Sequence, residues 1–290
     1  MSGVRLEIGG HLLAVTGSSA SFFEHYDGCR PFVVTDAEAE WDVRYDVPLE
    51  VWNDVRLLNR FAVADTGGQC CFERGTAGYQ FRMFDADGTM LLCMHHSAGS
   101  RLVEATSCDD ATALRFSLWF AVSMLTPSVG LSLVHSSTVV CKDKAVMFLG
   151  ESGTGKSTHS RLWLQHIPHV KLLNDDSPLL ATSAQQGVMP RVYGTPWSGK
   201  TPCYHAADFE LAAVVRLSQA GRNQMRRLRT IEAFGALQPS LPPALMQDVD
   251  YTDLLVEILS RTLAAVPFYH LECLPDADAA MLCHDTIFNS

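Results

Sequence analysis

The sequence has no excess of basic residues, and this argues against a general surface for polyanions. Its 290 residues include 22 Lys and Arg against 32 Asp and Glu, which gives a net charge of −10 at pH 7. The densest group of cations is formed by Arg226, Arg227 and Arg229, and we interpret it as the solvated edge of a strand. No nucleic-acid partner is therefore expected.

The pattern of cysteines lacks the spacing of metal cages and of disulfide frameworks. There are nine cysteines, an odd number, and no two of them stand in the Cys-x-x-Cys spacing of zinc sites. The adjacent pair Cys70 and Cys71 is interpreted as strand filling. We therefore expect reduced thiols, as in the cytosol.

The sequence also lacks a recognisable secretion signal and an uninterrupted membrane span. The opening MSGVRLEIGG has neither the basic nor the apolar region of a signal peptide. The longest apolar stretch, residues 118–134, is interrupted by Pro127 and Gly130, and it predicts a core helix followed by a strand. A cytoplasmic protein without a membrane partner is expected.

What the chain does have is apolar content. At 47% hydrophobic residues it can bury a sizeable core, in two modest domains or in one large one. Up to about residue 110, short alternating runs between turn residues predict strands, for example over 79–84 and 90–94. Beyond it, apolar residues at helical spacing predict a helix ending at Leu125 and capped by Asp109 or Asp110.

This change from strand-like to helix-like patterns near residue 110 predicts two domains. Residues 1–108 would form a β-rich recognition domain, and residues 109–290 an α/β catalytic domain.

The catalytic prediction begins with the stretch FLGESGTGKSTHS. Random sequence of this length matches the phosphate-loop (P-loop, Walker A) pattern in it about once in a hundred chains. An apolar run at 145–149 predicts a strand before the glycines, and 157–166 predicts a helix after them, so that backbone N–H groups would converge on a phosphate. An ordinary strand-to-helix turn, the alternative, would need neither the lysine nor the hydroxyl. The residues that satisfy the pattern are Gly150, Gly155, Lys156 and Ser157.

The second motif is VKLLNDDSPLL, in which an apolar strand over 170–173 ends near Asp175 and Asp176. Ligands collect at the carboxyl ends of strands in α/β sheets. Two adjacent carboxylates repel each other unless a cation or a proton relieves the charge, and Mg²⁺ bound to nucleotide phosphates would do so. A helix cap or a turn is the alternative.

The third signal is His135 in SLVHSSTVV, a lone histidine inside a strand predicted over residues 131–141. Taken alone, a satisfied interior histidine is the alternative to a catalytic one.

Together, LVHSSTVVCKDKAVMFLGESGTGKST and LLNDD resemble the HPr kinase/phosphorylase family, within the phosphoenolpyruvate carboxykinase-like nucleotide-binding fold. The resemblance covers residues 132–176. It implies an α/β P-loop core that uses ATP and Mg²⁺. The residues that it places around the phosphates are Gly150, Ser152, Gly153, Thr154, Gly155, Lys156, Ser157 and Thr158.

The same resemblance implies roles for individual side chains. Lys156 would bridge the β- and γ-phosphates, and Ser157 and Asp176 would serve Mg²⁺. Asp175 would be the base that accepts the proton of the acceptor hydroxyl, and His135 would sit beside the transferred phosphoryl group. The division of labour between the two aspartates is left open.

The chain departs from that family after residue 176. The later signature loop that engages HPr is missing, so HPr is not the expected substrate. In its place, YGTPWSGKT resembles a segment of shorter relatives found beside peptide-modifying gene clusters. Its Trp197 would offer a stacking face and Lys200 a cation for a phosphate or an acidic substrate, and the alternative is a structural turn with a buried tryptophan.

These motifs predict an ATP-dependent kinase that phosphorylates a serine- or threonine-type hydroxyl of a peptide, protein or small molecule. A nucleotide-binding sensor or assembly module is the first alternative, although binding alone would not need His135, Asp175 and Asp176 together. A phosphoenolpyruvate carboxykinase-type phosphotransferase is the second, and the short chain opposes it. The acceptor and a homo-oligomeric state are left open.

Overall fold

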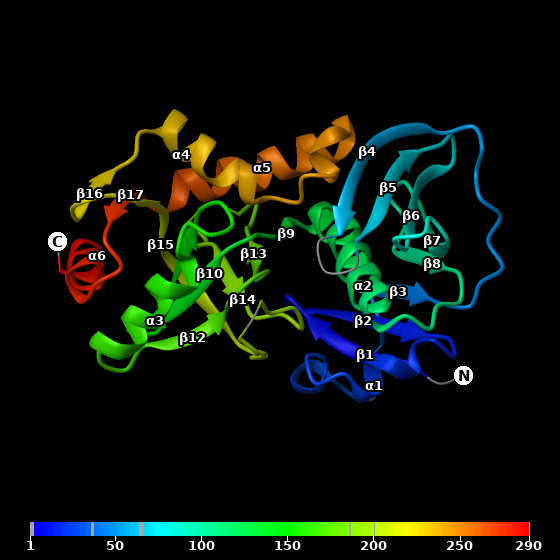
Figure 1. Cartoon of the computed structure of the whole chain (residues 1–290), viewed down its shortest axis with the longest axis horizontal. Helices are drawn as coiled ribbons and strands as arrows, with labels where there is room; N and C mark the ends of the chain where they lie inside the picture. The colour runs from blue at the N-terminus through cyan, green and yellow to red at the C-terminus, as the bar shows by residue number, and fades with distance from the viewer. Residues whose placement is uncertain (1–2, 36–37, 64–66, 186, 200, 290) are drawn as a thin grey trace. The chain divides into compact units, whose positions relative to one another are not determined.

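The computed structural model describes residues 3–35, 38–63, 67–185, 187–199 and 201–289, and the chain divides into two compact units (Figure 1). The first unit extends to Val129 and also includes Ala244–Thr252. The second unit contains Gly130–Pro243 and the chain from Asp253 onward. Each unit is built on a multistranded sheet with helices, so the protein is of mixed α/β class.

The first unit is dominated by one sheet with the strand order β1-β2-β3-β8-β7-β6-β5-β4. The pairs β2–β3 and β3–β8 are parallel, whereas the meander from β4 to β8 is antiparallel. Its elements are β1 (Gly3–Ile8), β2 (His11–Thr16), α1 (Ser21–His25), η1 (Arg30–Phe32), β3 (Trp41–Arg44), β4 (Arg56–Val63), β5 (Gly68–Arg74), β6 (Gly78–Phe84), β7 (Met90–Ser97), β8 (Leu102–Ala105), α2 (Ala111–Leu125), η2 (Pro127–Val129) and η4 (Leu245–Gln247).

Helix α2 packs on one face of this sheet. It begins as predicted, because the side chain of Asp110 accepts a hydrogen bond from the N–H of Ala113 at 2.7 Å. The ring of Phe120 stacks on Phe81 with centroids 4.2 Å apart and meets the edge of Phe72 at 5.2 Å. The boundary predicted after residue 108 differs from the division between the units, because these contacts join α2 to the sheet before it.

A second stretch of chain completes the first unit. The buried carboxylate of Asp248 accepts hydrogen bonds from Arg74 at 2.7 Å and from the hydroxyl of Tyr79 at 2.8 Å. The ring of Tyr251 lies 4.9 Å from that of Tyr79, centroid to centroid. Helix α5 (Val249–Ala265) therefore has its first turn in the first unit and its remaining length in the second.

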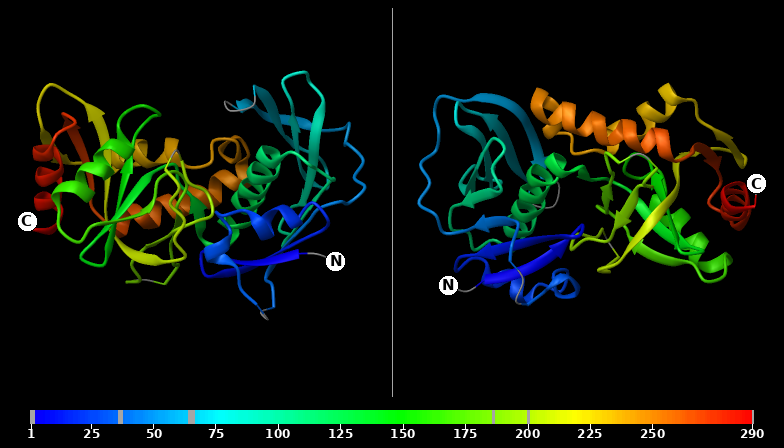
Figure 2. Two further views of the ribbon diagram at one scale, coloured as in Figure 1. Left: turned by 60° about the horizontal axis from the view of Figure 1, so that its bottom comes forward. Right: turned by 180° about the vertical axis from the view of Figure 1, so that it is seen from behind.

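The second unit is built on a sheet with the strand order β12-β10-β11-β15-β14-β13-β9, to which β17 and β16 are added beside β15. The helices α3 and α5 lie on opposite sides of its strands (Figure 2). Besides α5, its elements are β9 (Leu131–Leu133), β10 (Ser137–Cys141), β11 (Lys144–Leu149), α3 (Lys156–His166), β12 (Lys171–Asn174), β13 (Leu179–Ala181), β14 (Arg191–Tyr193), β15 (Asp208–Gln219), β16 (Gln224–Arg227), α4 (Thr230–Leu237), η3 (Gln238–Ser240), β17 (Phe268–Cys273) and α6 (Ala277–Phe288).

The direction of the central strands is set by the hairpin between β10 and β11. Lys142 and Asp143 in its turn have φ of 51° and 56°, the left-handed conformation of two-residue turns that match the twist of a sheet. Strand β10 is antiparallel to both β11 and β12, whereas β11 and β15 are parallel. The amino end of β10 and the carboxyl ends of β11 and β12 therefore meet at one edge of the sheet, which we call the loop edge.

The prediction of one continuous strand over residues 131–141 is wrong. The chain forms β9, leaves the sheet over residues 134–136, and re-enters it as β10. In the interruption, the N–H of Val134 bonds to the carbonyl of Pro178 and the N–H of His135 to that of Ser240, at 3.0 and 2.7 Å. Both acceptors lie far along the chain, and they satisfy the backbone in place of a strand ladder.

The core on the α3 face contains a buried histidine. Trp163 of α3 is fully buried and meets Phe148 of β11 edge to face, with centroids 5.5 Å apart. Its indole N–H donates to Nε2 of His159 at 3.1 Å, and Nδ1 of His159 has no hydrogen-bond partner within the described residues. Burial lowers the pKa of His159 to about 4, so the imidazole is neutral at pH 7.

Protonation of His159 is expected to destabilise the fold below neutral pH. Its folded pKa lies below that of an unfolded histidine near 6.5, so the contribution is present above pH 6.5 and is lost as the pH falls toward 4. Between pH 7.5 and 5.0 it would remove about 2 kcal/mol from the free energy of unfolding. Urea unfolding of the native protein and of His159→Gln at both pH values measures this term, because glutamine keeps an acceptor for Trp163 but does not titrate. The exposed His25→Gln serves as control, and an equal pH dependence in native protein and His159→Gln would contradict the assignment.

Other expectations concern cysteines, the basic group and membranes. All nine cysteines are unpaired, and Cys70 and Cys71 are buried on β5, as predicted. Arg226 and Arg227 are exposed on β16, which pairs with β17, and Arg229 follows them into the exposed start of α4. Within the part of the chain that the structure describes, no helix is both long and apolar enough to cross a membrane.

Candidate functional site

Three predicted segments come together at the loop edge. The P-loop follows the carboxyl end of β11, Asp175 and Asp176 follow that of β12, and His135 lies in the short segment between β9 and β10. The register makes them neighbours, because Ser137 of β10 pairs with Phe148 and Thr138 pairs with Asn174. Strand pairing thus brings together residues that are separated by up to about forty positions in the sequence.

The P-loop has the backbone conformation that its glycines permit. Gly150 has φ of 154°, and a Cβ at that position would stand 2.5 Å from Oγ1 of Thr154, which itself hydrogen-bonds to the carbonyl of Glu151. Gly155, with φ of 104°, is the N-cap of α3 and provides no side-chain cap. The first amides of α3 are therefore left for another acceptor, and a phosphate is the ligand that such a helix start accepts best.

Lys156 is held inside this turn. Its Nζ donates to the carbonyl of Gly150 at 2.7 Å and that of Glu151 at 3.3 Å, and it lies 3.0 Å from Nε2 of His135. Burial lowers the pKa of the Lys156 ammonium, and the carboxylates of Asp176 and Asp175 act in the opposite direction. The ammonium is thus held between the carbonyls of the loop and His135.

His135 links this lysine to the aspartate pair. Because Nε2 accepts from Lys156, the ring proton resides on Nδ1, and Nδ1 lies 3.6 Å from Oδ1 of Asp176. Burial alone would raise the pKa of Asp176, but the contact with His135, the bond from the hydroxyl of Ser177 and the charge of Lys156 outweigh it and lower that pKa. Lys156, His135 and Asp176 therefore form a chain of contacts across the loop edge.

Asn174 anchors the start of the Asp-Asp segment. Its side-chain oxygen accepts from the N–H groups of Asp176 and Ser177, both at 2.9 Å. Its amide donates to the carbonyl of Trp197 at 2.8 Å and to the hydroxyl of Thr195 at 3.2 Å. This fully buried side chain uses all of its hydrogen-bonding capacity, and it joins the aspartate pair to the loop after β14.

Asp175 differs from its neighbour in that its Oδ1 is buried and has no hydrogen-bond partner within the described residues. Behind it, Gly199 approaches so closely that a Cβ there would stand 2.7 Å from the carbonyl oxygen of Asp175. The backbone of Asp175 is thus backed by a loop, while one of its carboxylate oxygens is left for a ligand or a proton.

The other predicted residues have distinct positions. Trp197 is buried, with 5% of its surface exposed, and its carbonyl supports Asn174, which favours the alternative of a structural turn with a buried tryptophan. Lys200 lies outside the described residues. Ser152, Gly153 and Ser157 are exposed along the P-loop and the first turn of α3, and the Thr158 hydroxyl accepts a long bond from Arg161 at 3.3 Å.

Residues of the site that were not predicted include Asn174, Thr195 and Gln219. Gln219, at the end of β15, donates to the carbonyl of Gly153 at 3.2 Å and so contacts the P-loop from the neighbouring strand. The signal for Asn174 was its position directly before two aspartates, since asparagine commonly bonds to the backbone two residues on. Thr195 and Gln219 carried no such local signal.

Asn174→Ala is expected to lower the free energy of unfolding by about 3 kcal/mol. The substitution leaves the amides of Asp176 and Ser177 and the carbonyl of Trp197 without this partner, and unsatisfied buried groups cost about 1–3 kcal/mol each. Urea unfolding measures the change, with the exposed Asn53→Ala as the matched control. A loss of less than about 0.5 kcal/mol in the free energy of unfolding would show that the hydrogen bonds of Asn174 contribute nothing to stability.

Comparisons with known proteins give a likeness in structure but none in sequence. No family model matches the chain, and no curated protein is similar to it in sequence. Among solved structures, the chain is similar to the HPr(Ser) kinase/phosphatase from Coxiella burnetii, with 12% identity over 54% of this chain and 88% of that chain and a TM-score of 0.28. That score is too low to define a common fold, and the function is therefore inferred from this chain's own residues.

Proposed function

We propose that the protein is an ATP-dependent phosphotransferase that moves the γ-phosphoryl group to an alcohol hydroxyl of a peptide, protein or small molecule. The observation that carries the proposal is the arrangement at the loop edge. There, the P-loop cation Lys156 is connected through His135 to Asp176, and Asp175 next to it keeps a buried carboxylate oxygen without a partner among the described residues. A cation for phosphates and a carboxylate for a proton are the two groups that phosphoryl transfer needs.

The first step is binding of the triphosphate. The uncapped amides at the start of α3 and the ammonium of Lys156 supply positive charge toward the phosphates. Lys156 exchanges its bonds to the carbonyls of Gly150 and Glu151 for phosphate oxygens, and this exchange keeps its charge compensated.

The residues present fit a magnesium ion. The hydroxyl of Ser157 is exposed, and Asp176 keeps a lowered pKa and hence its negative charge, which makes an oxygen-only donor pair. Within the described residues no group of three or more His, Cys, Asp or Glu could hold a metal by itself, in keeping with an ion that takes its remaining ligands from phosphates and water. Bound there, Mg²⁺ would neutralise charge on the β- and γ-phosphates.

Asp175 is the residue that would receive the proton. As the acceptor oxygen forms its bond to the γ-phosphorus, the bond from that phosphorus to the β-phosphate oxygen breaks and ADP leaves. The hydroxyl proton passes to the carboxylate of Asp175, whose Oδ1 has no competing hydrogen bond within the described residues, whereas Asp176 is already engaged by His135 and Ser177. The contacts of the two aspartates thus support a base at Asp175 and a charge-holding role at Asp176.

Transfer of label from γ-labelled ATP tests the proposal. Purified protein with Mg²⁺ is offered serine- and threonine-containing peptides, a protein mixture and small alcohols, and the products are separated and treated with alkali. Label in an alkali-labile hydroxyl ester supports the kinase. ATP binding without label in any acceptor points to a sensor or assembly module, and oxaloacetate-dependent release of CO₂ to a decarboxylating phosphotransferase; either result would overturn the proposal.

A further inference from the structure

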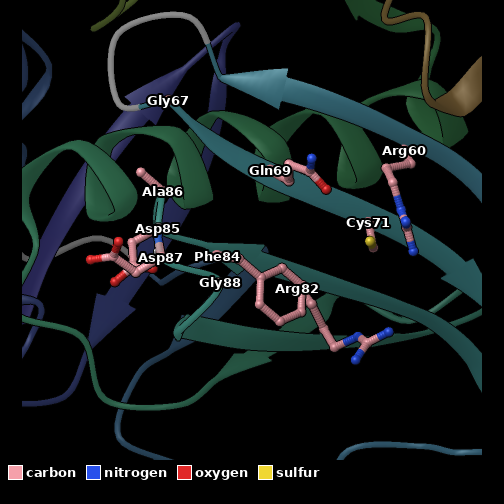
Figure 3. A pocket seen from close by; sticks show the side chains of 10 residues that line it. All are labelled: Arg60, Gly67, Gln69, Cys71, Arg82, Phe84, Asp85, Ala86, Asp87 and Gly88. Atoms are coloured by element: carbon pink, nitrogen blue, oxygen red, sulfur yellow. Dashed lines mark hydrogen bonds between the residues drawn. The ribbon is translucent and has the colours of Figure 1, made fainter.

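The first unit contains a polar pocket on the face of its sheet that α2 does not cover. It has a volume of about 440 Å³ and lies over β4, β5 and β6 and the turn after β6 (Figure 3). Arg60 and Arg82 stand at one end, Asp85 and Asp87 at the other, and the ring of Phe84 lies near the arginine end. Two cations, two carboxylates and an aromatic ring thus border one depression.

The guanidinium of Arg82 is fixed in place by the carboxylate of Glu73. Its Nε donates to Oε2 of Glu73 at 2.9 Å, and its Nη2 donates to the other oxygen of the same carboxylate. Glu73 is 4% exposed and also accepts from the buried amide of Gln80 at 2.8 Å. The guanidinium carbon lies 5.4 Å from the centroid of Phe84. The hydrogen bonds to Glu73 raise the pKa of Arg82, so this charge persists and its remaining N–H groups have a set direction.

Arg60 faces the same place without a partner among the described residues. It is exposed on β4 and makes no hydrogen bond or ion pair with them. The register puts it opposite Cys71 of β5, and Cys71 is opposite Arg82 of β6, so the two arginines flank one residue on the same face. Two strand spacings separate their backbones by roughly 10 Å, and Arg60 is the arginine nearer to the outer side of the sheet.

Among the residues that the structure describes, only one of these positive charges is compensated. Glu73 neutralises Arg82, and Arg60 remains as a cation without a counter-charge in a chain whose net charge is −10. Oδ1 of Asp85 accepts hydrogen bonds from the N–H groups of Asp87 and Thr89. The carboxylates of Asp85 and Asp87 carry negative charge at the end of the pocket opposite the arginines. The pocket is therefore dipolar, with a positive end at the arginines.

An extended peptide suits this pocket better than a compact metabolite. Strand β4 ends the order of the described strands in this sheet, so its outer side is an edge to which an extended chain can pair. A peptide running beside β4 would direct every second side chain toward the pocket face.

We propose that the first unit binds an extended peptide along the outer side of β4 through an acidic side chain, whose carboxylate pairs with Arg60 at the positive end of the pocket. Binding of the peptide stands on the pocket alone. Its identity as the phosphoryl acceptor rests on the proposed function.

Fluorescence anisotropy without ATP tests the binding separately from any transfer. The probes are two labelled pools of nine-residue peptides, with Glu or Gln fixed at the centre and Ala, Ser, Thr or Val elsewhere. We expect the native protein to bind the Glu pool about fivefold more tightly than the Gln pool, because one partly exposed ion pair contributes about 1 kcal/mol. In Arg60→Gln this preference should fall below about twofold, while Arg30→Gln, an exposed arginine elsewhere in the unit, should keep it.

Arg60→Gln removes no hydrogen bond within the described residues, so its circular dichroism spectrum and unfolding midpoint are expected to match those of the native protein. Equal binding of the two pools to native protein, or an unchanged preference in Arg60→Gln, would overturn the proposal. N-acetylglutamate amide is titrated as a competitor. If it displaced the Glu pool as effectively as an unlabelled peptide does, a small carboxylate rather than a peptide would be the ligand, and the proposal would also fail.

Discussion

Asp175→Asn is expected to lower the turnover number for phosphoryl transfer by about 10²- to 10⁴-fold while the affinity for ATP stays near native. An amide keeps the shape of the carboxylate and can still accept a hydrogen bond, but it cannot take up the proton of the acceptor hydroxyl. The fold should tolerate the change, because Oδ1 of Asp175 has no partner to lose within the described residues. Single-turnover transfer from γ-labelled ATP, together with equilibrium binding of ATP, measures both quantities.

Asp176→Asn is the matched comparison, since it changes the neighbouring carboxylate in the same way. Asp176 is engaged by His135 and Ser177, and its loss should raise the Mg²⁺ concentration that gives half-maximal activity rather than remove the proton acceptor. Identical Mg²⁺ and turnover profiles for the two variants would show that the two roles are not divided. Full activity in both would exclude the aspartate pair from the reaction.

Lys156→Ala is expected to abolish measurable transfer, with a loss of about 10³-fold or more, and to weaken ATP binding by about 10- to 100-fold. The ammonium is the cation that the loop holds 2.7 Å from the carbonyl of Gly150 and 3.0 Å from His135, and no other lysine occupies the described P-loop. Alanine removes the charge that the β- and γ-phosphates would share.

Lys144→Ala provides the control for this substitution. Lys144 starts the strand that leads to the P-loop, and its side chain pairs with Glu210 at the surface, 3.0 Å away. Its loss should leave ATP binding and turnover within about twofold of native, because exposed ion pairs contribute little. Undiminished turnover in Lys156→Ala would contradict the P-loop assignment.

Local patterns predicted the segments whose structure is set by neighbouring residues. The start of α2 at Asp110 follows from one side chain and one amide, and the order of strand, glycine turn and helix around Lys156 needs about twenty consecutive residues. Such features require no knowledge of the rest of the chain.

Features that depend on distant partners were missed. His135 leaves the sheet because its N–H finds Ser240, more than a hundred residues away, and no local rule signals that bond. The hydrogen bonds of Asn174 require Thr195 and Trp197, which lie in another loop. The helices α4 and α6 and the strand β17 were not predicted either. The placement of Arg60 and Arg82 on either side of Cys71 depends on strand register, which alternation alone does not specify.

The hydrogen bonds from Arg74 and Tyr79 to Asp248 bear on how the gene can be divided. A gene fragment that stops at Val129 encodes β1 to β8 and α2, but it omits the carboxylate that Arg74 and Tyr79 share and the ring of Tyr251 beside them. The polypeptide from such a fragment would expose a tyrosine hydroxyl and an arginine that are paired in the whole protein. Recombination that exchanges the front of this gene for another must therefore carry the codons for residues 244–252 as well, or replace their contacts.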